Sequence, residues 1–206
     1  MALSMTKSTK SPEERRKGEI RRQVLAAREA LSAESREDFS RIIFTRVMQA
    51  WEYQQAATVL LYAHFRSEVQ TDRLLRATLA AGKRLVLPRV NRARHELELY
   101  LVTDPATQLV PGTWEIPEPD PARCPRVPLE EIGCVIAPGV AFDPWGGRTG
   151  YGGGFYDRLL NRLSPAQARV CLGLAFEAQI IYEVPRGLFD AHVGAVATEL
   201  RLMENR

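Results

Sequence analysis

The sequence lacks a long apolar run, paired cysteines and any strong excess of one charge. A helix that spans a membrane needs about 20 predominantly apolar residues, and no such stretch exists here, so we expect no membrane association. No apolar stretch follows the basic N-terminal residues, so we expect no secretory signal peptide. Lys and Arg number 28 against 25 Asp and Glu, for a net charge of +3. This bias is too weak for a typical nucleic-acid-binding domain.

Cysteine is scarce as well. Cys124, Cys134 and Cys171 are widely spaced, and no Cys-x-x-Cys pair is present. Neither a disulfide framework nor a zinc site is therefore expected, and three unpaired thiols fit a reducing compartment. We expect a cytoplasmic monomer whose partners are small molecules.

What the sequence does have is the composition of one globular domain. Its 206 residues are 45% hydrophobic and 26% charged, which is average for a folded protein, and one domain is typical of this length. Residues 1–10 match no pattern, and we interpret them as a disordered basic tail or a cloning remnant. Residues 11–203 are the expected single domain.

Two helices are predicted at the start of this domain. Ser11-Pro12-Glu13-Glu14 forms a capping box with proline at the first helical position, so a helix is expected from there to about Leu31. Its first half carries a cluster of Lys and Arg within residues 14–28, which suits an anionic small ligand. Ser32 can cap a second helix, whose apolar residues recur at helical spacing: Phe39, Ile42, Ile43, Val47 and Trp51.

Beyond residue 57, predicted strands alternate with predicted helices. Apolar runs indicate strands at 58–62, 85–87, 97–102, 134–137, 170–176 and 193–198, and helices are expected at 71–82 and 155–163. Such alternation is typical of a parallel sheet. The expected fold is therefore α/β: a mostly parallel, Rossmann-like sheet flanked by helices, with the N-terminal helical pair. Pro88 is expected to close its strand, and seven prolines predict an irregular excursion over residues 103–130.

A glycine tract between a predicted strand and a predicted helix carries most of the chemistry. Six glycines lie between Gly146 and Gly154 in the sequence PGVAFDPWGGRTGYGGGFYDRLL. Glycine permits positive φ and lets a ligand approach backbone N–H groups, which bind anions. Ligands of open α/β sheets bind where strands end. Arg148 suits a phosphate, and Asp157 is a candidate Mg²⁺ ligand.

The residues of this tract leave two interpretations open. The tract lacks the Gly-Lys-Ser/Thr of a Walker A loop and the Rossmann fingerprint, so a flexible turn is as compatible with it as a phosphate site. An isolated aspartate such as Asp157 is more often solvated or paired with arginine than bound to a metal.

The same tract closely resembles the signature of the 5-formyltetrahydrofolate cyclo-ligase family, also called 5,10-methenyltetrahydrofolate synthetases. Further segments resemble elements of that family in the same order along the chain: 17–21 (Lys-x-x-x-Arg), 61–71 (Glu-x-x-Thr), 114–119 (Glu-Pro), 174–179 and 185–198. The chain departs from the family pattern at Phe189-Asp190, where His-Asp is usual, and at Gly194, where a second Asp is usual.

The resemblance implies ATP-dependent cyclisation of 5-formyltetrahydrofolate to 5,10-methenyltetrahydrofolate through a phosphorylated formyl group, with release of ADP and phosphate. It implies Arg148 and Tyr156 as catalytic residues, and Mg²⁺ held by Asp157 and Asp190. The implied ATP-binding residues are Lys17, Gly18, Glu19, Ile20, Arg21, Arg148, Thr149, Gly150, Tyr151, Gly152, Gly153, Gly154, Phe155 and Tyr156. The implied folate-binding residues are Ala63, Glu68, Trp114, Tyr151, Gly152, Gly153, Gly154 and Phe155.

Two alternatives stay open at this point. The departure at Phe189 is compatible with a paralogue that binds ATP but acts on another substrate. A non-catalytic binding module of the same fold is the other alternative, and the intact Arg148, Asp157 and Asp190 argue against it. His64, His95 and His192 are scattered, and we assign them no catalytic role.

Overall fold

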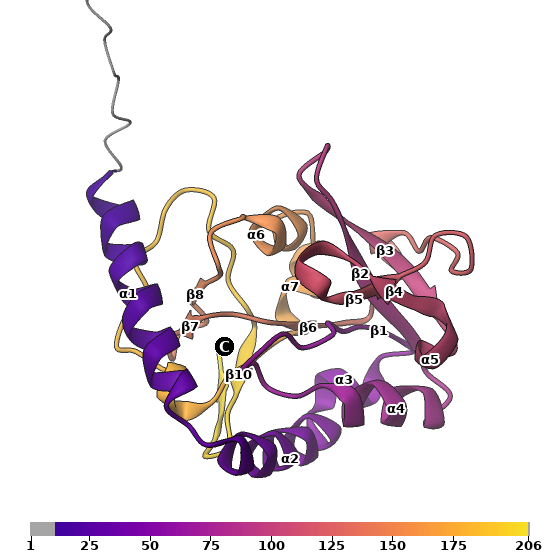
Figure 1. Cartoon of the computed structure of the whole chain (residues 1–206), viewed down its shortest axis with the longest axis horizontal. Coiled ribbons are helices and arrows are strands. Elements are labelled where there is room, and N and C mark those ends of the chain that lie inside the picture. Colours follow the sequence, from indigo (N-terminus) through magenta and orange to yellow (C-terminus); the bar gives the residue numbers. More distant parts are fainter. Residues whose placement is uncertain (1–10, 206) are drawn as a thin grey trace, which may run out of the picture.

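The computed structural model describes residues 11–205, and a seven-stranded sheet is the centre of that part of the chain (Figure 1). The strands follow one another across the sheet in the order β11-β10-β9-β6-β1-β2-β3. Their bounds are β1 Thr58–Leu60, β2 Arg84–Asn91, β3 Glu96–Val102, β6 Cys134–Ala137, β9 Cys171–Leu174, β10 Ala195–Ala197 and β11 Leu202–Glu204.

The five inner strands run parallel, and the two edge strands run antiparallel to them. β1 pairs in parallel with both β2 and β6, β6 with β9, and β9 with β10. β3 and β11 are antiparallel to their neighbours. The mostly parallel α/β fold expected from the sequence is therefore confirmed.

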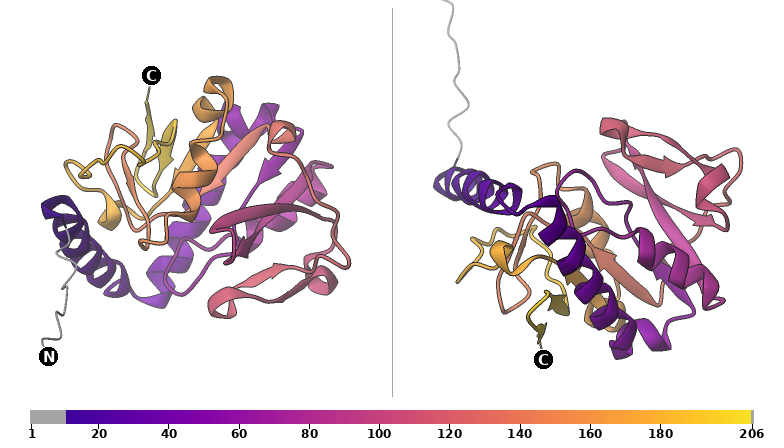
Figure 2. Two further views of the ribbon diagram at one scale, coloured as in Figure 1. Left: turned by 90° about the horizontal axis from the view of Figure 1, so that it is seen from above. Right: turned by 60° about the horizontal axis from the view of Figure 1, so that its bottom comes forward.

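Helices cover both faces of this sheet, and α1 lies at its side. The helices are α1 Pro12–Glu29, α2 Ala33–Gln49, α3 Trp51–Gln55, α4 Asp72–Ala80, α5 Pro105–Gln108, α6 Phe155–Leu160 and α7 Pro165–Arg169. Short 3-10 turns are η1 Thr113–Glu115, η2 Leu129–Glu131 and η3 Glu177–Gln179. In Figures 1 and 2, α1 stands beside the hairpin of β7 (Ala141–Phe142) and β8 (Arg148–Thr149), far from the β2–β3 hairpin.

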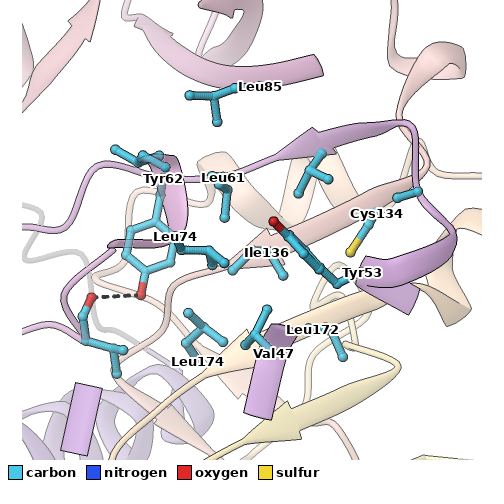
Figure 3. Close-up of a cluster of buried hydrophobic side chains, with 14 of the residues drawn as sticks. Val47, Tyr53, Leu61, Tyr62, Leu74, Leu85, Cys134, Ile136, Leu172 and Leu174 are labelled. Atoms are coloured by element: carbon cyan, nitrogen blue, oxygen red, sulfur yellow. Dashed lines mark hydrogen bonds between the residues drawn. The ribbon is translucent and has the colours of Figure 1, made fainter. Parts of the chain in front are cut away.

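Alternate residues of the inner strands supply two separate cores. Val59 of β1 and Ile136 of β6 belong to the core under α2, α3 and α4, whereas Leu60 and Val135 belong to the core that packs against α6. This alternation follows from the two-residue period of a strand. Figure 3 shows the first core, where side chains from several strands and helices meet: Val47, Tyr53, Leu61, Tyr62, Leu74, Leu85, Cys134, Ile136, Leu172 and Leu174.

The N-terminal helices begin where the sequence predicts them. The Ser11 hydroxyl accepts a hydrogen bond from the Glu14 amide, and the Glu14 carboxylate accepts one from the Ser11 amide, so the capping box of α1 is formed. Ser32 caps α2 in a similar way through the Ser35 amide. The prediction of one continuous second helix is wrong, because extended backbone at Ala50 separates α2 from α3.

Several expected details differ from the structure. Trp51 and Ile42 were expected on the buried side of the second helix, yet 64% and 41% of their surfaces are exposed. β2 continues past Pro88 to Asn91, because β1 pairs only with residues 84–86 and the rest of that edge of β2 stays open. Proline is tolerated at such an edge. α6 ends at Leu160, three residues earlier than expected.

Other elements carry too weak a pattern to be predicted. Residues 103–130 include α5 and a small two-stranded sheet of β4 (Leu109–Pro111) and β5 (Pro117–Pro119) within the irregular excursion. The short α7 and β11 also lack a sequence prediction. The tail predicted for residues 1–10 lies outside the described residues. No helix of the described chain combines the length and apolarity that membrane crossing requires.

Two glycine substitutions should change stability in opposite directions. A Cβ on Gly173, in the central strand β9, would lie 2.5 Å from the buried ring of Phe142, so Gly173→Ala should lower the free energy of unfolding by about 1–3 kcal/mol. A Cβ on Gly18, within α1, meets nothing within 4 Å. Gly18→Ala should therefore raise the free energy of unfolding by about 0.5–1 kcal/mol, since glycine weakens a helix interior. Urea denaturation measures both, and a stabilised Gly173→Ala would contradict the packing described here.

Candidate functional site

A cavity of about 310 Å³ lies where β1 and β6 end. These two strands are neighbours in the sheet, but the chain leaves β1 toward β2 on one side and β6 toward β9 on the other. Their connections therefore diverge, and such a divergence leaves a crevice at the carboxyl ends of parallel strands. The segment after β1 supplies Ala63 and Glu68 to the cavity, and the glycine tract after β6 supplies the opposite wall.

The first part of the glycine tract is a structural turn. The Asp143 carboxylate is fully buried and accepts hydrogen bonds from the amides of Trp145, Gly147 and Val184, at 2.8–3.0 Å. A Cβ on Gly146 would lie 2.2 Å from a backbone oxygen, and one on Gly147 would lie 2.2 Å from the Asp143 carboxylate. These two glycines are thus needed for packing of the β7–β8 turn, and neither lines the cavity.

The second part of the tract, residues 150–154, does reach the cavity. Gly152 has φ 103° and Gly154 has φ 67°, so positive φ occurs among the three consecutive glycines as expected, although not at Gly153. The Arg21 side chain donates from Nε to the Gly150 carbonyl at 2.7 Å. A Cβ on Gly152 would point at the Arg21 guanidinium, 3.6 Å from its Cζ.

Arg148 and Tyr156 bring unused polar atoms to this wall. Arg148 is 3% exposed and lies against the cavity, where its Nη2 donates to Asp157 at 2.6 Å. Arg148 Nε and the Tyr156 hydroxyl are buried without a hydrogen-bond partner in residues 11–205. Burial raises the pKa of Tyr156, so its hydroxyl remains a donor. Unsatisfied buried groups cost about 1–3 kcal/mol each, a cost that a bound ligand or water would offset.

Lys17 and Asp190 form a second charged pair near the tract. The Lys17 ammonium contacts the Asp190 carboxylate and also that of Glu13. Burial lowers the pKa of Lys17, but the bonds to Asp190 and Glu13 outweigh burial and raise it above its usual value. The Asp157 carboxylate accepts a 3.3 Å bond from the Ala191 amide, so the two aspartates lie on adjoining segments.

The two aspartates provide oxygen ligands without forming a complete metal cage. Among the described residues, no three His, Cys, Asp or Glu side chains cluster as a metal site. Mg²⁺ usually takes one or two carboxylates and completes its shell with water and phosphate oxygens. The carboxylates of Asp157 and Asp190 therefore fit a magnesium ion that arrives with a nucleotide. Each carboxylate would then contact both the ion and its present partner, Arg148 or Lys17.

Glu68 is the acidic group of the opposite wall. It is 6% exposed, and its carboxylate accepts the Phe65 amide at 2.9 Å. Burial raises the pKa of Glu68, whereas the Phe65 amide, Arg28 and Tyr151 each lower it. A buried carboxylate in a cavity lined mainly by apolar and aromatic side chains is suited to accept N–H groups of a planar heterocycle.

Most residues assigned to folate lie around this one cavity. It is lined by Ala63, Glu68, Trp114, Tyr151, Gly153, Gly154 and Phe155, but not by Gly152. The backbone at Trp114 is left-handed, with φ 57°. Apolar surface comes from the β2–β3 hairpin and the excursion, and sequence reasoning missed these residues because nothing marks them locally: Leu87, Pro88, Val90, Leu97, Ile116 and Pro117.

The residues assigned to ATP divide between two elements. The cavity is lined by Arg148, Gly150, Tyr151, Gly153, Gly154, Phe155 and Tyr156, with Thr149 buried beside them. Lys17, Gly18, Glu19, Ile20 and Arg21 lie on α1 outside the cavity. Of these, Ile20 packs against Val24 and Val140, and Glu19 lines a separate surface hollow with Tyr182.

Sequence reasoning placed Arg28 only in the basic cluster of residues 14–28 and gave it no site role, yet it is 1% exposed on α1. Its Nε donates to the Ser67 hydroxyl at 3.0 Å and its Nη2 to the Tyr151 hydroxyl at 2.8 Å. Helical spacing was the available signal, because residues 21 and 28 are two turns apart and therefore share a face.

Comparisons with known proteins identify the family of this chain. Residues 13–199 match the model of the 5-formyltetrahydrofolate cyclo-ligase family. The 5-formyltetrahydrofolate cyclo-ligase of Escherichia coli (strain K12) is 32% identical over 177 residues, which cover 86% of this chain and 97% of that protein. A probable 5-formyltetrahydrofolate cyclo-ligase of Caenorhabditis elegans is 28% identical, over 89% and 92%.

The solved structures lead to the same family. An NMR structure of Aquifex aeolicus 5,10-methenyltetrahydrofolate synthetase superposes with a TM-score of 0.80 at 34% identity, over 92% of this chain and 93% of that one. The 5,10-methenyltetrahydrofolate synthetase of Mycoplasma pneumoniae, at 22% identity and a TM-score of 0.69, shares the fold. The family match along residues 13–199 decides the assignment: the chain belongs to the 5-formyltetrahydrofolate cyclo-ligase family.

Proposed function

We propose that this protein converts 5-formyltetrahydrofolate and ATP into 5,10-methenyltetrahydrofolate, ADP and phosphate. One observation carries the proposal beyond family membership. The cavity has a buried carboxylate, Glu68, on one wall and Arg148 with the glycine loop on the other. A heterocycle with N–H donors suits the first wall, and a triphosphate suits the second.

The reaction needs both substrates in one place for a chemical reason. The oxygen of an N-formyl group is a poor leaving group, so attack of folate nitrogen 10 on the formyl carbon does not go to completion unaided. Transfer of the γ-phosphoryl group to that oxygen makes a phosphate that can depart. Nitrogen 10 then attacks the formyl carbon and loses its N–H proton to water. The C–O bond breaks with release of phosphate, which leaves the methenyl bridge between nitrogens 5 and 10. Phosphoryl transfer depends mainly on alignment and charge neutralisation.

The basic side chains are placed to supply that neutralisation. Arg148 and Tyr156 both line the cavity, and the Arg148 Nε and the Tyr156 hydroxyl are buried without a hydrogen-bond partner in residues 11–205. We assign both to the formyl oxygen and the transferred phosphoryl group. Lys17 and Arg21 lie one helical turn apart on α1, next to the glycine loop, and we assign them to the remaining phosphates with the backbone of Gly150–Gly154.

The folate ring fits the apolar part of the cavity. Tyr151 and Phe155 offer aromatic faces from the glycine loop, and Trp114 offers one from the excursion. Flat rings pack favourably on such faces. Glu68 then accepts the ring N–H groups, and Ala63 leaves room beside it.

We assign Mg²⁺ to Asp157 and Asp190, and when bound it would neutralise charge on the ATP phosphates. The departure from the family pattern at Phe189 does not disturb this assignment. The Phe189 side chain is 82% exposed, whereas Asp190 points back to Lys17 and the Gly187 amide.

The direct test of the proposal is an absorbance assay. Protein mixed with ATP, Mg²⁺ and 5-formyltetrahydrofolate should generate the methenyl chromophore, and omission of ATP should abolish the signal. ATP binding without chromophore would instead support a paralogue with another substrate. Absence of both ATP binding and chromophore would support a binding module and refute the proposal.

A prediction follows from the conformation of Gly152. Gly152→Ala strains a backbone with φ 103° and puts a methyl group toward Arg21. ATP affinity should fall by about tenfold, equivalent to ~1.4 kcal/mol, in calorimetric titrations. Gly82→Ala is the matched control, because Gly82 also has positive φ (69°) but its Cβ would meet open space at the end of α4.

Both variants should lose about 1–2 kcal/mol of stability through backbone strain. Only Gly152→Ala should lose ATP affinity. Equal ATP affinities for the two variants would mean that the loop is a structural turn and that the phosphates bind elsewhere.

The magnesium assignment predicts a change in how Mg²⁺ affects ATP binding. For the wild type, Mg²⁺ should strengthen ATP binding, and Asp157→Asn should remove most of that gain because one ligand is lost. The ratio of the two ATP affinities, with and without Mg²⁺, isolates this effect from any loss of stability caused by breaking the pair with Arg148. Asp38→Asn, at an exposed pair with Arg41 on α2, is the control. An unchanged ratio in Asp157→Asn would exclude Asp157 as a ligand.

A further inference from the structure

Arg28 is a buried cation that lies behind the folate wall without lining the cavity. It belongs to α1, the helix that also carries Lys17 and Arg21. Arg21 bonds to the carbonyl of Gly150, and Arg28 bonds to the side chain of the next residue, Tyr151. One helix therefore holds the start of the glycine loop at two consecutive residues.

Arg28 lies close to Glu68. Its Nη2 donates to the Tyr151 hydroxyl, and both Arg28 and Tyr151 lower the pKa of the Glu68 carboxyl. Arg28 also donates to Ser67, the residue before Glu68. Tyr151 lines the cavity and is 47% exposed, while its hydroxyl is held by Arg28. Arg28 thus fixes an aromatic face and the adjoining carboxylate together.

This arrangement is poor as a purely structural device. Arg28 Nη1 is buried without a partner in residues 11–205. Burying a charge is costly, and replacement of buried ionic groups by apolar side chains is often neutral or stabilising. A methionine would fill a similar volume without this cost. The use of arginine at this position therefore calls for a role in ligand binding.

We propose that Arg28 is a positioning residue for the folate: it fixes the Tyr151 hydroxyl and supplies the positive charge beside Glu68, so that this buried carboxylate is held ionised and in place for the substrate. The inference rests on the proposed function, because Glu68 is assigned there to the N–H groups of the pterin ring. Arg28 itself touches no substrate in this assignment.

The charged and titratable groups around Glu68 are consistent with this role. Burial raises the pKa values of Tyr62 and Tyr156, and that of Tyr151 to about 12, so these phenols stay neutral. Two arginines line the cavity. The guanidinium of Arg66 lies over the ring of Phe65, and that of Arg148 is paired with Asp157. Arg28 is the arginine whose charge lowers the pKa of Glu68 against the effect of burial.

Removal of this charge should make folate binding more sensitive to pH. We would measure the affinity for 5-formyltetrahydrofolate by calorimetry without ATP, between about pH 5 and pH 8. Below the pKa of Glu68 the wild-type affinity should fall by about tenfold per pH unit. In Arg28→Met this fall should begin at a higher pH. Burial raises the pKa of Glu68, and the charge of Arg28 no longer opposes that effect. Arg28→Lys keeps the charge, so its fall should begin near the wild-type pH.

A double substitution separates this role from a merely structural one. Glu68→Gln should bind weakly at every pH, and adding Arg28→Met to it should introduce no pH dependence, because no carboxylate remains at residue 68. Arg22→Met, at an exposed arginine of the same helix, should match the wild type. An Arg28→Met variant whose affinity falls at the same pH as that of the wild type would overturn the inference.

Stability gives an independent measurement. The pKa of Glu68 is raised on folding, so its contribution to stability is greatest below the unfolded-state pKa and is lost as the pH rises through the folded-state pKa. In Arg28→Met this loss should extend to higher pH than in the wild type. If Arg28→Met does not fold, Arg28→Gln, which also removes the charge, provides the same comparison. A wild type that forms no methenyl chromophore refutes the proposed function, whereas an active wild type with an unshifted Arg28→Met refutes only the role of Arg28.

Discussion

The parallel pairing of β1 with β6 is the constraint on which the site depends. Because the two strands point the same way and their connections diverge, the segment with Glu68 and the glycine tract emerge side by side. Neither segment forms a pocket alone: one is an irregular stretch before α4, and the other is a hairpin and a loop before α6. The hydrophobic cores that hold the two strands in register therefore also fix the distance between the acidic wall and the basic wall.

The helix α1 is attached to the rest of the protein partly through side chains of the candidate site. Its buried residues are Val24 and Arg28, and its small apolar cluster includes Val140 and Ala141. The remaining attachments are polar: Lys17 to Asp190, Arg21 to Gly150 and Arg28 to Tyr151. A ligand that binds only the docked helix stabilises the docked state by mass action. Docking of α1 and binding of substrate are thus linked through the same cations.

The sequence predicts those features that depend on local patterns. Apolar runs located the inner strands, the capping box located α1, and the spacing of glycines located the loop. Features that depend on tertiary contacts could not be predicted. β2 passes through Pro88 because its far edge is open, Trp51 is exposed because the chain turns at Ala50, and Gly147 serves the buried Asp143 rather than a phosphate. Motifs in the sequence located Arg148 and the glycine loop. The site positions of Arg28 and of the apolar lining could not be predicted, because they depend on contacts between residues distant in sequence.

Several polar atoms near this cavity are buried in a way that packing alone does not explain. Arg148 Nε, Thr149 Oγ1, Tyr156 Oη and Arg28 Nη1 are buried and have no hydrogen-bond partner within residues 11–205. Three of the four come from residues 148–156, where β8 meets α6. A fold selected for stability alone would fill these positions with apolar side chains, since each unsatisfied group costs free energy. Most of these atoms lie near the carboxyl end of β6, where we propose that ATP binds. Hydrogen bonds to the phosphate oxygens of such a ligand would offset the free-energy cost of leaving these atoms unsatisfied.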